Sequence, residues 1–408
     1  MQTFRVWSYN GPMRIAFVGP FALQPKRTMA VRALPLAKAL AAHGHEVLVL
    51  LPPWDHPQDA GREWVEEGVR VRNVRLPPKL PLAHHVLLTW HLLRLAVQHR
   101  PDVIHCFKPK SYAGLTAWAI WQLRRMGWIQ VRLLVDADDW EGAGGWNELE
   151  PYSWMQKRFF AWQERWGLTH CDALTVASRA LETIAWSSGV APPKAVYLPN
   201  GWWPAQHVPA SRAVPELRQR VKLDGAPVAL LYTRFFEYRI ERGLAILEGV
   251  LTEVPEARWV IVGKGLFGEE DQFLAMARAR GIAERITYAG WVPPEQLQSY
   301  FALARVAIYP FDDTLLNRCK CAVKLIDLLA AGVPVVADQV GQNGEYIQHG
   351  VSGLLVTPGD TEAFVAAVVR LLRHPALAER LGKGARGRIQ EHFAWATLAK
   401  TVEGAYRQ

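Results

Sequence analysis

Two arginines in the second half of the chain have the positions expected of phosphate ligands. Arg234 follows the apolar run VALLYT, and Arg242 comes eight residues later, at the expected start of a helix. Arginine binds phosphate oxygens through a planar fork of N–H groups, and the first turn of a helix adds backbone N–H groups that have no partner within the helix. The pair favours a phosphate or diphosphate site at the end of a strand, although Arg242 taken alone would equally suit a solvated surface.

The segment KCAVKLIDLLAAGVPVVA, residues 320–337, adds two lysines. On a helix, Lys320, Lys324 and Asp327 stand at i, i+4 and i+7 and share one face, while apolar residues form the opposite face. Gly332 would end this helix. A solvated face, with Lys324 and Asp327 as a surface pair, is the simpler alternative. Taken with the two arginines, the lysines predict up to four cations around a diphosphate.

Two glycine-bearing loops follow other strands of the same half. Gly341 and Asn343 lie in the loop VGQNGE, directly after VPVVAD, where backbone N–H groups could approach a phosphate or a polar ring closely. The loop VGKG at 262–265 is weaker support, since a tight turn explains its glycines. The first loop is therefore the better candidate for ligand binding.

The first half carries an acidic cluster at a strand end, DADD at 136–139. Asp138 and Asp139 are placed to orient or deprotonate a hydroxyl group, whereas Asp136 is expected to cap the following turn. An Asp-x-Asp pair could instead hold a divalent metal and a diphosphate, but that alternative leaves the cations of the second half unexplained. His105, at the end of PDVIH, points to the same sheet edge, and a structural histidine is the equal alternative.

Alternating strands and helices must bring these residues together. Short apolar runs followed by helical segments occur in two series, separated by a proline-rich stretch that begins near residue 203. This alternation is typical of βαβ units in a parallel sheet. We therefore expect an α/β chain with two doubly wound, Rossmann-like domains, whose strand ends face a cleft between them. The predicted divisions are a domain over 1–205, a domain over 206–390, and a helix over 391–408 that packs back on the first domain.

The composition is that of a globular protein with more than one domain. The chain has 408 residues, of which 50% are hydrophobic and 21% charged. A formal net charge of +9 favours anionic partners, but the basic residues are scattered and no nucleic-acid-binding module is recognised. The four cysteines lack the spacing of a metal site or a disulfide framework, so we expect them to be reduced and structural.

No targeting or membrane-spanning segment is evident. Residues 1–12 read as a loose leader rather than a signal peptide, and no run reaches the roughly 18 apolar residues of a spanning helix. We therefore expect a cytoplasmic protein that is at most peripheral to the membrane.

Tryptophan is abundant, with 18 residues, and several fall in one expected helix. The segment SWMQKRFFAWQERWG places Met155, Phe159, Trp162 and Trp166 on one stripe. An intramolecular packing face is the expected role of such a stripe, and contact with a membrane surface is the alternative.

The ordered set of motifs resembles the family-4 glycosyltransferases of the GT-B fold. The segment VKLIDLLAAGVPVVADQVGQNGEYIQHGVSGLLVTPGD is similar to the donor-site signature of that family. Five shorter motifs are similar to it at matching places, namely ALAAHGHEVLVL, PDVIH, CDALTVASRAL, YLPNG and HFAWATLAK. The resemblance implies transfer of a hexose from a nucleotide sugar to an acceptor hydroxyl, with retained anomeric configuration and with no obligatory metal or other cofactor.

The acceptor implied by this resemblance is a glycan, a lipid or a small molecule, in polysaccharide or glycolipid biosynthesis. Two alternatives stay open. One is a nucleotide-sugar epimerase on the same two-domain scaffold, and the other is a non-catalytic binder of nucleotide sugars.

The resemblance also assigns residues of the donor site. Arg234 and Arg242 would bind the diphosphate, and Asp327 would hold the ribose. The family usually carries two glutamates eight positions apart, the second of which is Asp327 here. The first falls on Cys319, which cannot bind a sugar hydroxyl as a carboxylate does. Two nearby carboxylates could substitute as ligands of the donor sugar, together with the VGQNGE loop: Asp312 and Asp313.

The first half departs from the family pattern at two places. Lys26 and Arg27 occupy the loop LQPKRT, where the family usually has a pair of glycines. Asp138 and Asp139 stand near the position at which the family has a histidine. These departures bear on the donor sugar and on the catalytic groups more than on the fold.

Overall fold

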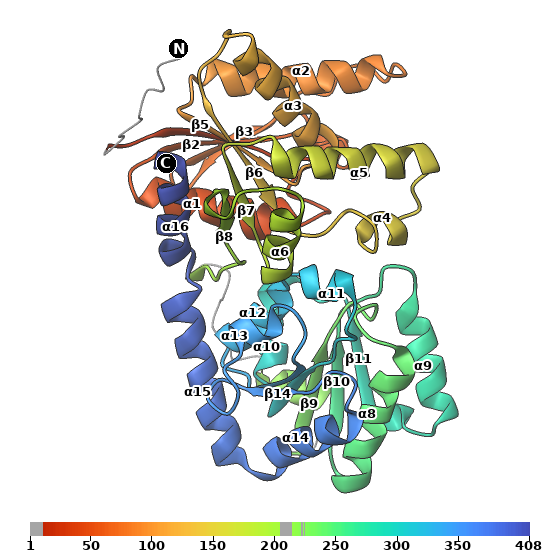
Figure 1. Ribbon diagram of the computed structural model, residues 1–408. Coiled ribbons are helices and arrows are strands. Elements are labelled where there is room, and N and C mark those ends of the chain that lie inside the picture. The colour runs from red at the N-terminus through yellow and green to blue at the C-terminus, as the bar shows by residue number, and fades with distance from the viewer. Residues whose placement is uncertain (1–10, 205–213, 222, 224) are drawn as a thin grey trace. The chain divides into compact units, whose positions relative to one another are not determined.

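The computed structural model describes residues 11–204, 214–221, 223 and 225–408 (Figure 1). The leader predicted for residues 1–12 and the middle of the proline-rich stretch after residue 203 therefore fall largely outside the described residues. The chain forms two compact units, which are described separately. The first contains the chain up to Asn200 together with Cys319–Cys321 and Trp395–Gln408, and the second contains Gly201–Arg318 and Ala322–Ala394.

The first unit is built on an eight-stranded sheet with the order β3-β4-β2-β1-β5-β6-β7-β8. Every neighbouring pair is parallel except β3 with β4, which are antiparallel at the edge. The strands are β1 (Arg14–Val18), β2 (Glu46–Leu51), β3 (Glu63–Glu66), β4 (Val69–Asn73), β5 (Val103–Phe107), β6 (Arg132–Ala137), β7 (Ala173–Val176) and β8 (Ala195–Tyr197). The strand order reverses between β1 and β5, where doubly wound sheets open a crevice at the carboxyl ends of their strands.

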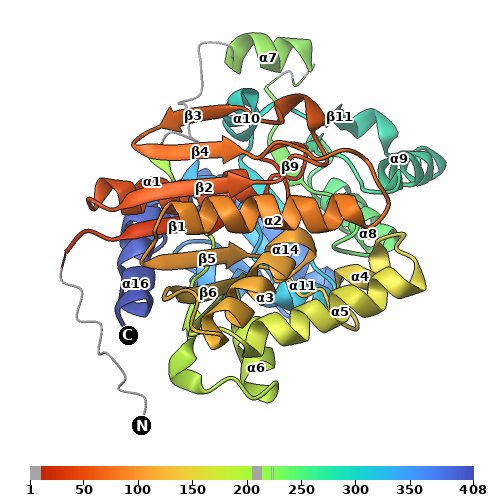
Figure 2. The same cartoon turned by 90° about the horizontal axis from the view of Figure 1, so that it is seen from above.

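Helices cover both faces of this sheet (Figures 1 and 2). One face carries α2 (Ala83–Gln98), α3 (Ser111–Arg125) and α5 (Trp154–Thr169), in which α3 packs against both of the others. On the other face α1 (Leu34–Ala42), which continues a short π-helix (Met29–Ala33), packs against α16 (Trp395–Arg407). The described part of this unit also contains α4 (Trp146–Leu149) and α6 (Arg179–Ser187).

The second unit contains a six-stranded, all-parallel sheet with the order β11-β10-β9-β12-β13-β14. Its strands are β9 (Val228–Tyr232), β10 (Arg258–Val262), β11 (Ile286–Gly290), β12 (Val306–Tyr309), β13 (Val335–Asp338) and β14 (Leu354–Val356). Its helices are α7 (Val214–Arg220), α8 (Ile240–Glu253), α9 (Glu269–Ala279), α10 (Pro294–Phe301), α11 (Leu315–Cys319), α12 (Val323–Ala330), α13 (Asn343–Tyr346), α14 (Thr361–Arg373) and α15 (Pro375–His392). The predicted βαβ alternation is thus present in both units.

Continuous apolar runs form the central strands because helices cover both faces of the sheet. All five residues of β9, VALLY, are buried, and the same holds for four of the five residues of β10. The core of the second unit includes Trp259 and Phe364, which are fully buried. These rigid strands fix the positions of the residues that follow them.

The helix predicted to begin at Lys320 begins three residues later. Ala322 has an extended backbone, with φ −78° and ψ 109°, and α12 starts at Val323. Lys320 precedes the helix, in a segment that clusters with the first unit, so the prediction that it shares a helical face with Lys324 and Asp327 is wrong. Lys324 and Asp327 do lie on α12, one turn apart, and Gly332, with φ +78°, follows the helix end as predicted.

The aromatic stripe of α5 is exposed, which corrects the prediction that it is an intramolecular packing face. Met155, Phe159 and Trp162 all project from the surface, and Trp166 is half-buried. The helix packs instead through Gln163, a buried residue whose side chain bonds both backbone groups of Ser111 at the start of α3. Among the described residues, no helix is both long and apolar enough to cross a membrane.

Candidate active site

The second unit places its predicted ligands at the point where the strand order reverses. The chain enters this sheet at the central strand β9 and adds β10 and β11 on one side of it. It then returns to add β12, β13 and β14 on the other side. Ligands of doubly wound sheets bind outside the carboxyl ends of the strands at such a point. The loop after β9 carries Arg234, and the loop after β12 carries Asp312 and Asp313.

The loop after β9 is held by one buried carboxylate. Glu237 Oε2 accepts a hydrogen bond from Thr233 Oγ1 at 3.2 Å and another from the backbone N–H of Arg234 at 3.1 Å. Phe235, which follows Arg234, has φ +66°, a left-handed conformation that is uncommon for an aromatic residue. Glu237 therefore fixes the course of the backbone at Arg234, and strain of this kind is often found at functional loops.

Two of the predicted cations lie next to the last residue of β9. The ammonium of Lys324, on α12, lies 3.7 Å from the ring centroid of Tyr232. Arg234 follows Tyr232 by two residues, and both cationic side chains are half-buried. Asp327 is also half-buried and stands one helical turn after Lys324. The structure thus brings Lys324, Asp327 and the Arg234 loop to one end of the sheet.

Arg242, another predicted ligand of the diphosphate, is paired with a buried carboxylate. Its guanidinium forms two hydrogen bonds with the carboxylate of Asp338, at 2.7 and 2.9 Å, and both side chains are buried. Asp338 Oδ2 also accepts the backbone N–H of Phe311 at 2.8 Å. Burial raises the pKa of Asp338, although the arginine and this N–H group act against that rise. The pair joins the start of α8, the end of β13 and the loop after β12.

The two aspartates considered as sugar ligands are engaged in local contacts. Asp312 Oδ2 accepts the backbone N–H of Arg239 at 2.8 Å, at the start of α8. Asp313 forms a two-bond pair with Arg318, at 2.5 and 2.7 Å, on the exposed surface of α11. That pairing holds the pKa of Asp313 below its usual range.

The loop after β13 lies close to α11. Gly341 has φ +49°, and a Cβ atom at this position would lie 2.6 Å from the carbonyl oxygen of Arg318. Only glycine therefore fits this approach without movement of the backbone. Asn343 is buried, and its Nδ2 donates to the carbonyl of Asp338 at 3.0 Å. Both residues shape the loop that the sequence marked as a binding loop.

The sequence analysis missed a buried asparagine that links these loops. Asn317 Nδ2 donates to the carbonyl oxygens of Glu237 and Asp312, at 2.7 and 2.8 Å. Its Oδ1 is buried and has no hydrogen-bond partner among the residues that the structure describes. No sequence motif identifies Asn317, Glu237 or Asp338 as a buried polar residue. The sequence shows only that each is a polar residue that ends or follows an expected strand.

The first unit gathers a second set of charged residues at its own reversal point. Lys108, directly after β5, lies within an ion-pair distance of three carboxylates: Asp138 at 3.2 Å, Asp139 at 3.1 Å and Glu141 at 3.4 Å. Lys110 binds Glu141 at 2.5 Å from the other side. Lys108 itself has φ +57°, which again marks a strained loop at a strand end.

These carboxyl groups have different affinities for protons. Burial raises the pKa of Asp138 to about 7, although Lys108 opposes the shift. Burial also raises the pKa of Glu164, well above its usual value, and neither of its oxygens has a hydrogen-bond partner within the described residues. Glu141 is equally buried, but Lys108 and Lys110 hold its pKa below its usual value. The pKa of Asp138 thus lies close to neutral pH, where a carboxyl group can serve as a general acid or base.

Asp136 is not a turn cap, contrary to the prediction. It is fully buried and forms a two-bond ion pair with Arg32 of the π-helix, at 2.6 and 2.7 Å. The guanidinium of Arg32 offers the charge and the fork geometry that a buried carboxylate needs, so the side chain turns inward instead of bonding its own turn. The Asp136-x-Asp138 pair is thus divided between two cations, Arg32 and Lys108.

His105 lies in the interior of the first unit. Its Nδ1 is 2.9 Å from Tyr406 Oη of α16, and its Nε2 is 3.1 Å from Thr175 Oγ1. Burial lowers its pKa to about 4, so the ring is neutral at physiological pH. Because the side chain is fully buried among these partners, we do not carry the predicted catalytic role of His105 further.

Two regions of the chain match known protein families. Residues 27–201 match the family described as "Glycosyl transferase 4-like domain", and residues 228–374 match "Glycosyl transferases group 1". Both matched families are glycosyltransferase domains, and together they cover most of the chain, which is therefore a two-domain glycosyltransferase. The charged clusters described above both lie in matched regions, one in each.

Relatives of this glycosyltransferase share about a quarter of its residues. It is 25% identical to a glycogen synthase of Mycobacterium tuberculosis, covering 91% of this chain and 88% of the relative. It is 26% identical to a GDP-mannose-dependent alpha-(1-6)-phosphatidylinositol monomannoside mannosyltransferase of Mycolicibacterium smegmatis, covering 88% and 91%. The solved structure of Anabaena HepE in complex with UDP and glucose superposes with a TM-score of 0.70 at 17% identity, covering 96% and 98%. The predicted GT-B class, with two parallel-sheet α/β domains, is thus confirmed.

Other features of the glycosyltransferase stand outside the two clusters. Lys26, in the loop after β1, has its ammonium 5.4 Å from the ring centroid of Trp54, and Arg27 beside it is exposed. All four cysteines are buried, and none is in a disulfide. Over the residues that the structure describes, no group of three or more His, Cys, Asp or Glu side chains is arranged to hold a metal ion.

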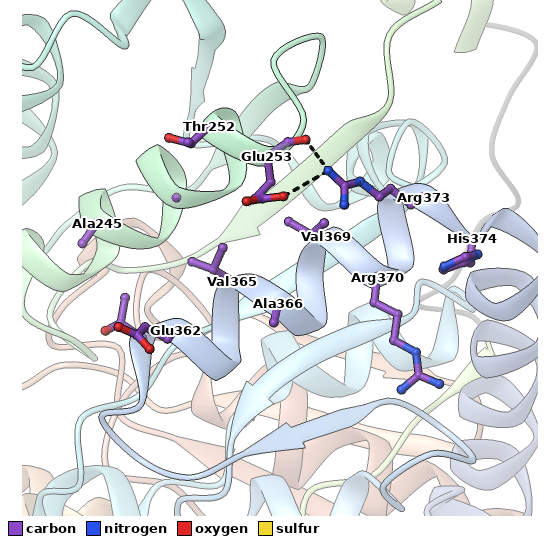
Figure 3. A pocket seen from close by; sticks show the side chains of 12 residues that line it. Ala245, Thr252, Glu253, Glu362, Val365, Ala366, Val369, Arg370, Arg373 and His374 are labelled. Atoms are coloured by element: carbon purple, nitrogen blue, oxygen red, sulfur yellow. Dashed lines mark hydrogen bonds and ion pairs between the residues drawn. The ribbon is translucent and has the colours of Figure 1, made fainter.

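A groove between α8 and α14 contains none of the predicted ligands (Figure 3). Small and apolar side chains of both helices form its floor, among them Ala245, Val365 and Val369. Arg373 bridges its end by binding Glu253 at 3.1 Å in an exposed pair. Arg370, Arg373 and His374 also line the groove, but Arg373 is paired with Glu253 and none of the three is a predicted ligand of the diphosphate.

We expect the Asp138→Asn variant to be more stable than the wild type at pH 8, by about 1–4 kcal/mol. The pKa of Asp138 is raised in the folded state, so its contribution to stability is complete below the pKa of the unfolded chain and is lost as the pH rises through about 7. Asparagine does not ionise and avoids this loss. Urea unfolding at pH 8 and pH 4 measures the difference, which should disappear at pH 4. An equal difference at both pH values would show that ionisation of Asp138 is not its cause.

Proposed function

We propose that this glycosyltransferase transfers a hexose from a nucleoside diphosphate sugar to an acceptor hydroxyl, with retained configuration and without an obligatory metal. The observation that carries the proposal is the meeting of Lys324 and the Arg234 loop at Tyr232, at the reversal point of the second sheet. Two half-buried cations at such a point suit a diphosphate. The match of residues 228–374 to the group 1 family supports the same placement.

The proposed chemistry depends on stabilising the leaving group. When the bond between the anomeric carbon and the diphosphate oxygen breaks, negative charge develops on that oxygen. Lys324 and Arg234 would stabilise this charge electrostatically, a role for which a fixed, partly desolvated cation is well suited. Asp327, one turn after Lys324, would accept hydrogen bonds from the ribose hydroxyls.

Arg242 acts in this proposal as a positioning residue. Because its guanidinium is bound to Asp338, it would hold the loops after β12 and β13 in place rather than supply the main charge to the diphosphate. The proposed contacts of the donor sugar remain Asp312 and Asp313, on the loop after β12, together with Gly341, on the loop after β13, and Asn343, the first residue of α13. Lys320 precedes α12, and its role as a ligand of the diphosphate stays a prediction from the sequence.

Retention is proposed to follow from attack on the front face of the donor. The acceptor hydroxyl oxygen would bond to the anomeric carbon on the side from which the diphosphate leaves, and its proton would pass to the departing phosphate oxygen. Asp138 and Asp139 of the first unit would orient the acceptor hydroxyl. A pKa of about 7 for Asp138 allows it to accept or donate a hydrogen bond near neutral pH.

The nucleotide and the acceptor stay open within the proposal. The names of the related proteins include a GDP-mannose-dependent enzyme and a complex with UDP and glucose, so the base is not fixed by similarity. The acceptor class, a glycan, a lipid or a small molecule, and the cytoplasmic location are predictions from the sequence.

Thermal stabilisation by nucleotides tests the proposal. The purified protein is heated with UDP, GDP, ADP or dTDP, each with and without EDTA, and we expect one nucleotide to raise the melting temperature equally in both conditions. At a concentration 100 times its Kd, a ligand stabilises the folded state by about 2.7 kcal/mol. A shift that EDTA abolishes would contradict metal independence. A shift with no release of sugar from the matching donor would favour the non-catalytic binder, for which the buried thiol of Cys319 gives a reason.

A further inference from the structure

Exposed apolar side chains are distributed unevenly along the chain. Among the described residues, sixteen of the twenty large hydrophobic side chains that are exposed belong to the first unit. Eleven of the sixteen lie on or next to three helices: Leu82, Val86, Leu87, Trp90, Trp118, Met126, Trp128, Trp154, Met155, Phe159 and Trp162. These helices, α2, α3 and α5, form one layer on one face of the sheet, shown in Figure 2. We name this surface the α2–α3–α5 face.

The exposure on this face is large for aromatic and aliphatic residues. Trp154 and Met155, in the first turn of α5, are 69% and 72% exposed, and Trp128, after α3, is 73% exposed. Leu82, directly before α2, is 81% exposed. The surface of a soluble monomeric protein seldom exposes so many apolar side chains together, and such patches generally mark an interaction surface.

The charge on the same helices has one sign. Neither α2 nor α3 contains an aspartate or a glutamate, and the one acidic residue of α5, Glu164, is buried. Exposed arginines interrupt the apolar groups: Arg94, Arg125, Arg158 and Arg165. None of these four arginines forms an ion pair among the described residues. The acidic residues that flank α5 in the sequence are Glu148 and Glu150 before it and Asp172 after it, and Asp172 is bound by Arg124 of α3 at 2.7 Å.

Apolar and basic groups alternate along α5 itself. Trp154, Arg158 and Trp162 follow one another at four-residue intervals and therefore share one stripe of the helix. The guanidinium carbon of Arg158 lies 5.2 Å from the ring centroid of Trp154. Tryptophan and arginine together suit the boundary between lipid headgroups and acyl chains, where one end of a side chain is dry and the other is hydrated.

We propose that the α2–α3–α5 face binds the surface of an anionic lipid bilayer. Aromatic and aliphatic side chains would enter the acyl boundary, and the arginines would contact the lipid phosphates. A second copy of this chain fits the face less well, because two such faces would bring arginines together without an acidic partner. Nucleic acid is bound by basic and aromatic side chains, so it would not account for the exposed aliphatic side chains, such as Leu82, Val86 and Met155.

Co-sedimentation with lipid vesicles tests this proposal without any nucleotide. We expect the protein to bind vesicles of phosphatidylcholine with 30% phosphatidylglycerol, to bind pure phosphatidylcholine much more weakly, and to dissociate as salt is raised. Each arginine near an anionic surface is expected to contribute about a fivefold factor in affinity. The triple variant Arg125→Gln/Arg158→Gln/Arg165→Gln should therefore bind roughly 100-fold more weakly.

A second triple variant tests the apolar component, and a matched variant serves as its control. Trp154→Ser/Phe159→Ser/Trp162→Ser should lose at least about tenfold in vesicle affinity. The control Trp186→Ser, on α6, removes a tryptophan that is 43% exposed, close to the 45% of Trp162, and should bind as the wild type does.

Three results would overturn the proposal. These are equal binding to charged and uncharged vesicles, full binding by both triple variants, and a dimer that the aromatic variant dissociates while no vesicle binding occurs. The last result would assign the face to a second copy of the chain. Because the assay contains no donor, it fails or succeeds independently of the nucleotide-binding test.

Discussion

Replacing Lys324 by alanine is expected to remove half or more of the thermal stabilisation that the cognate nucleoside diphosphate gives to the wild type. The ammonium lies 3.7 Å from the ring of Tyr232 at the end of β9 and is only half-exposed, so it would contact phosphate in a partly desolvated place. A hydrogen bond to a charged group contributes about 1.5–3 kcal/mol, which weakens binding roughly 10- to 150-fold when it is lost. At 100 times the wild-type Kd, the stabilisation would fall from about 2.7 kcal/mol to roughly 0.3–1.4 kcal/mol.

Two further variants separate a ligand contact from a general effect of charge. Lys324→Arg keeps the positive charge and the contact with the ring and should retain a measurable part of the stabilisation. Lys383→Ala removes a lysine of α15 that is exposed and paired with Glu379 at 2.7 Å, and it should behave as the wild type does. If Lys324→Ala binds the nucleotide with unchanged affinity in calorimetry, the diphosphate does not lie at the end of β9.

The parts of the fold that the sequence predicts are those set by local pattern. Apolar runs such as VALLY are long enough for one buried strand, and most of them are followed by a helix, so the parallel pairing in the two sheets follows from periodicity. The position of Arg234 at a strand end follows from the same pattern. The start of α12 does not, because helical spacing continues through Lys320 and only the extended backbone at Ala322 ends it.

The partners of the buried charges could not be predicted, because tertiary packing selects them. Arg242 and Asp338 are 96 residues apart in the chain, and Arg32 and Asp136 are 104 residues apart. A sequence pattern identifies each of these residues as charged, but it does not show which opposite charge the fold brings within 3 Å. The same limit applies to α5, whose stripe has the spacing of a core helix although Met155, Phe159 and Trp162 are exposed. Burial decides between these outcomes, and burial depends on the neighbouring elements.

The Arg32→Met variant is expected to be about 3–5 kcal/mol less stable than the wild type at pH 7. Arg32 is fully buried, and its removal leaves the carboxylate of Asp136, also fully buried, without its counter-charge. The carbonyl of Leu198 and Oδ1 of Asn200 would lose a donor as well. For a unit of this size the melting temperature should fall by roughly 6–20 °C, measured by calorimetry. The control Arg14→Ala, which removes an exposed partner of Glu46, should change stability by less than about 1 kcal/mol.

The dependence on pH distinguishes an unpaired charge from a simple loss of packing. Burial acts to raise the pKa of Asp136, but in the wild type Arg32 overcomes it and lowers the pKa below that of the unfolded chain. Without Arg32, burial is opposed by the weaker effects of His105 and Thr175, so we expect the pKa of Asp136 to rise above the unfolded value. The folded variant then binds a proton that the unfolded chain releases, and its deficit should be smallest near pH 4 and grow as the pH rises. A deficit that is the same at pH 4 and pH 7 would indicate lost packing alone. The double variant Arg32→Met/Asp136→Leu, which removes both charges, should recover a large part of the stability and lose this pH dependence.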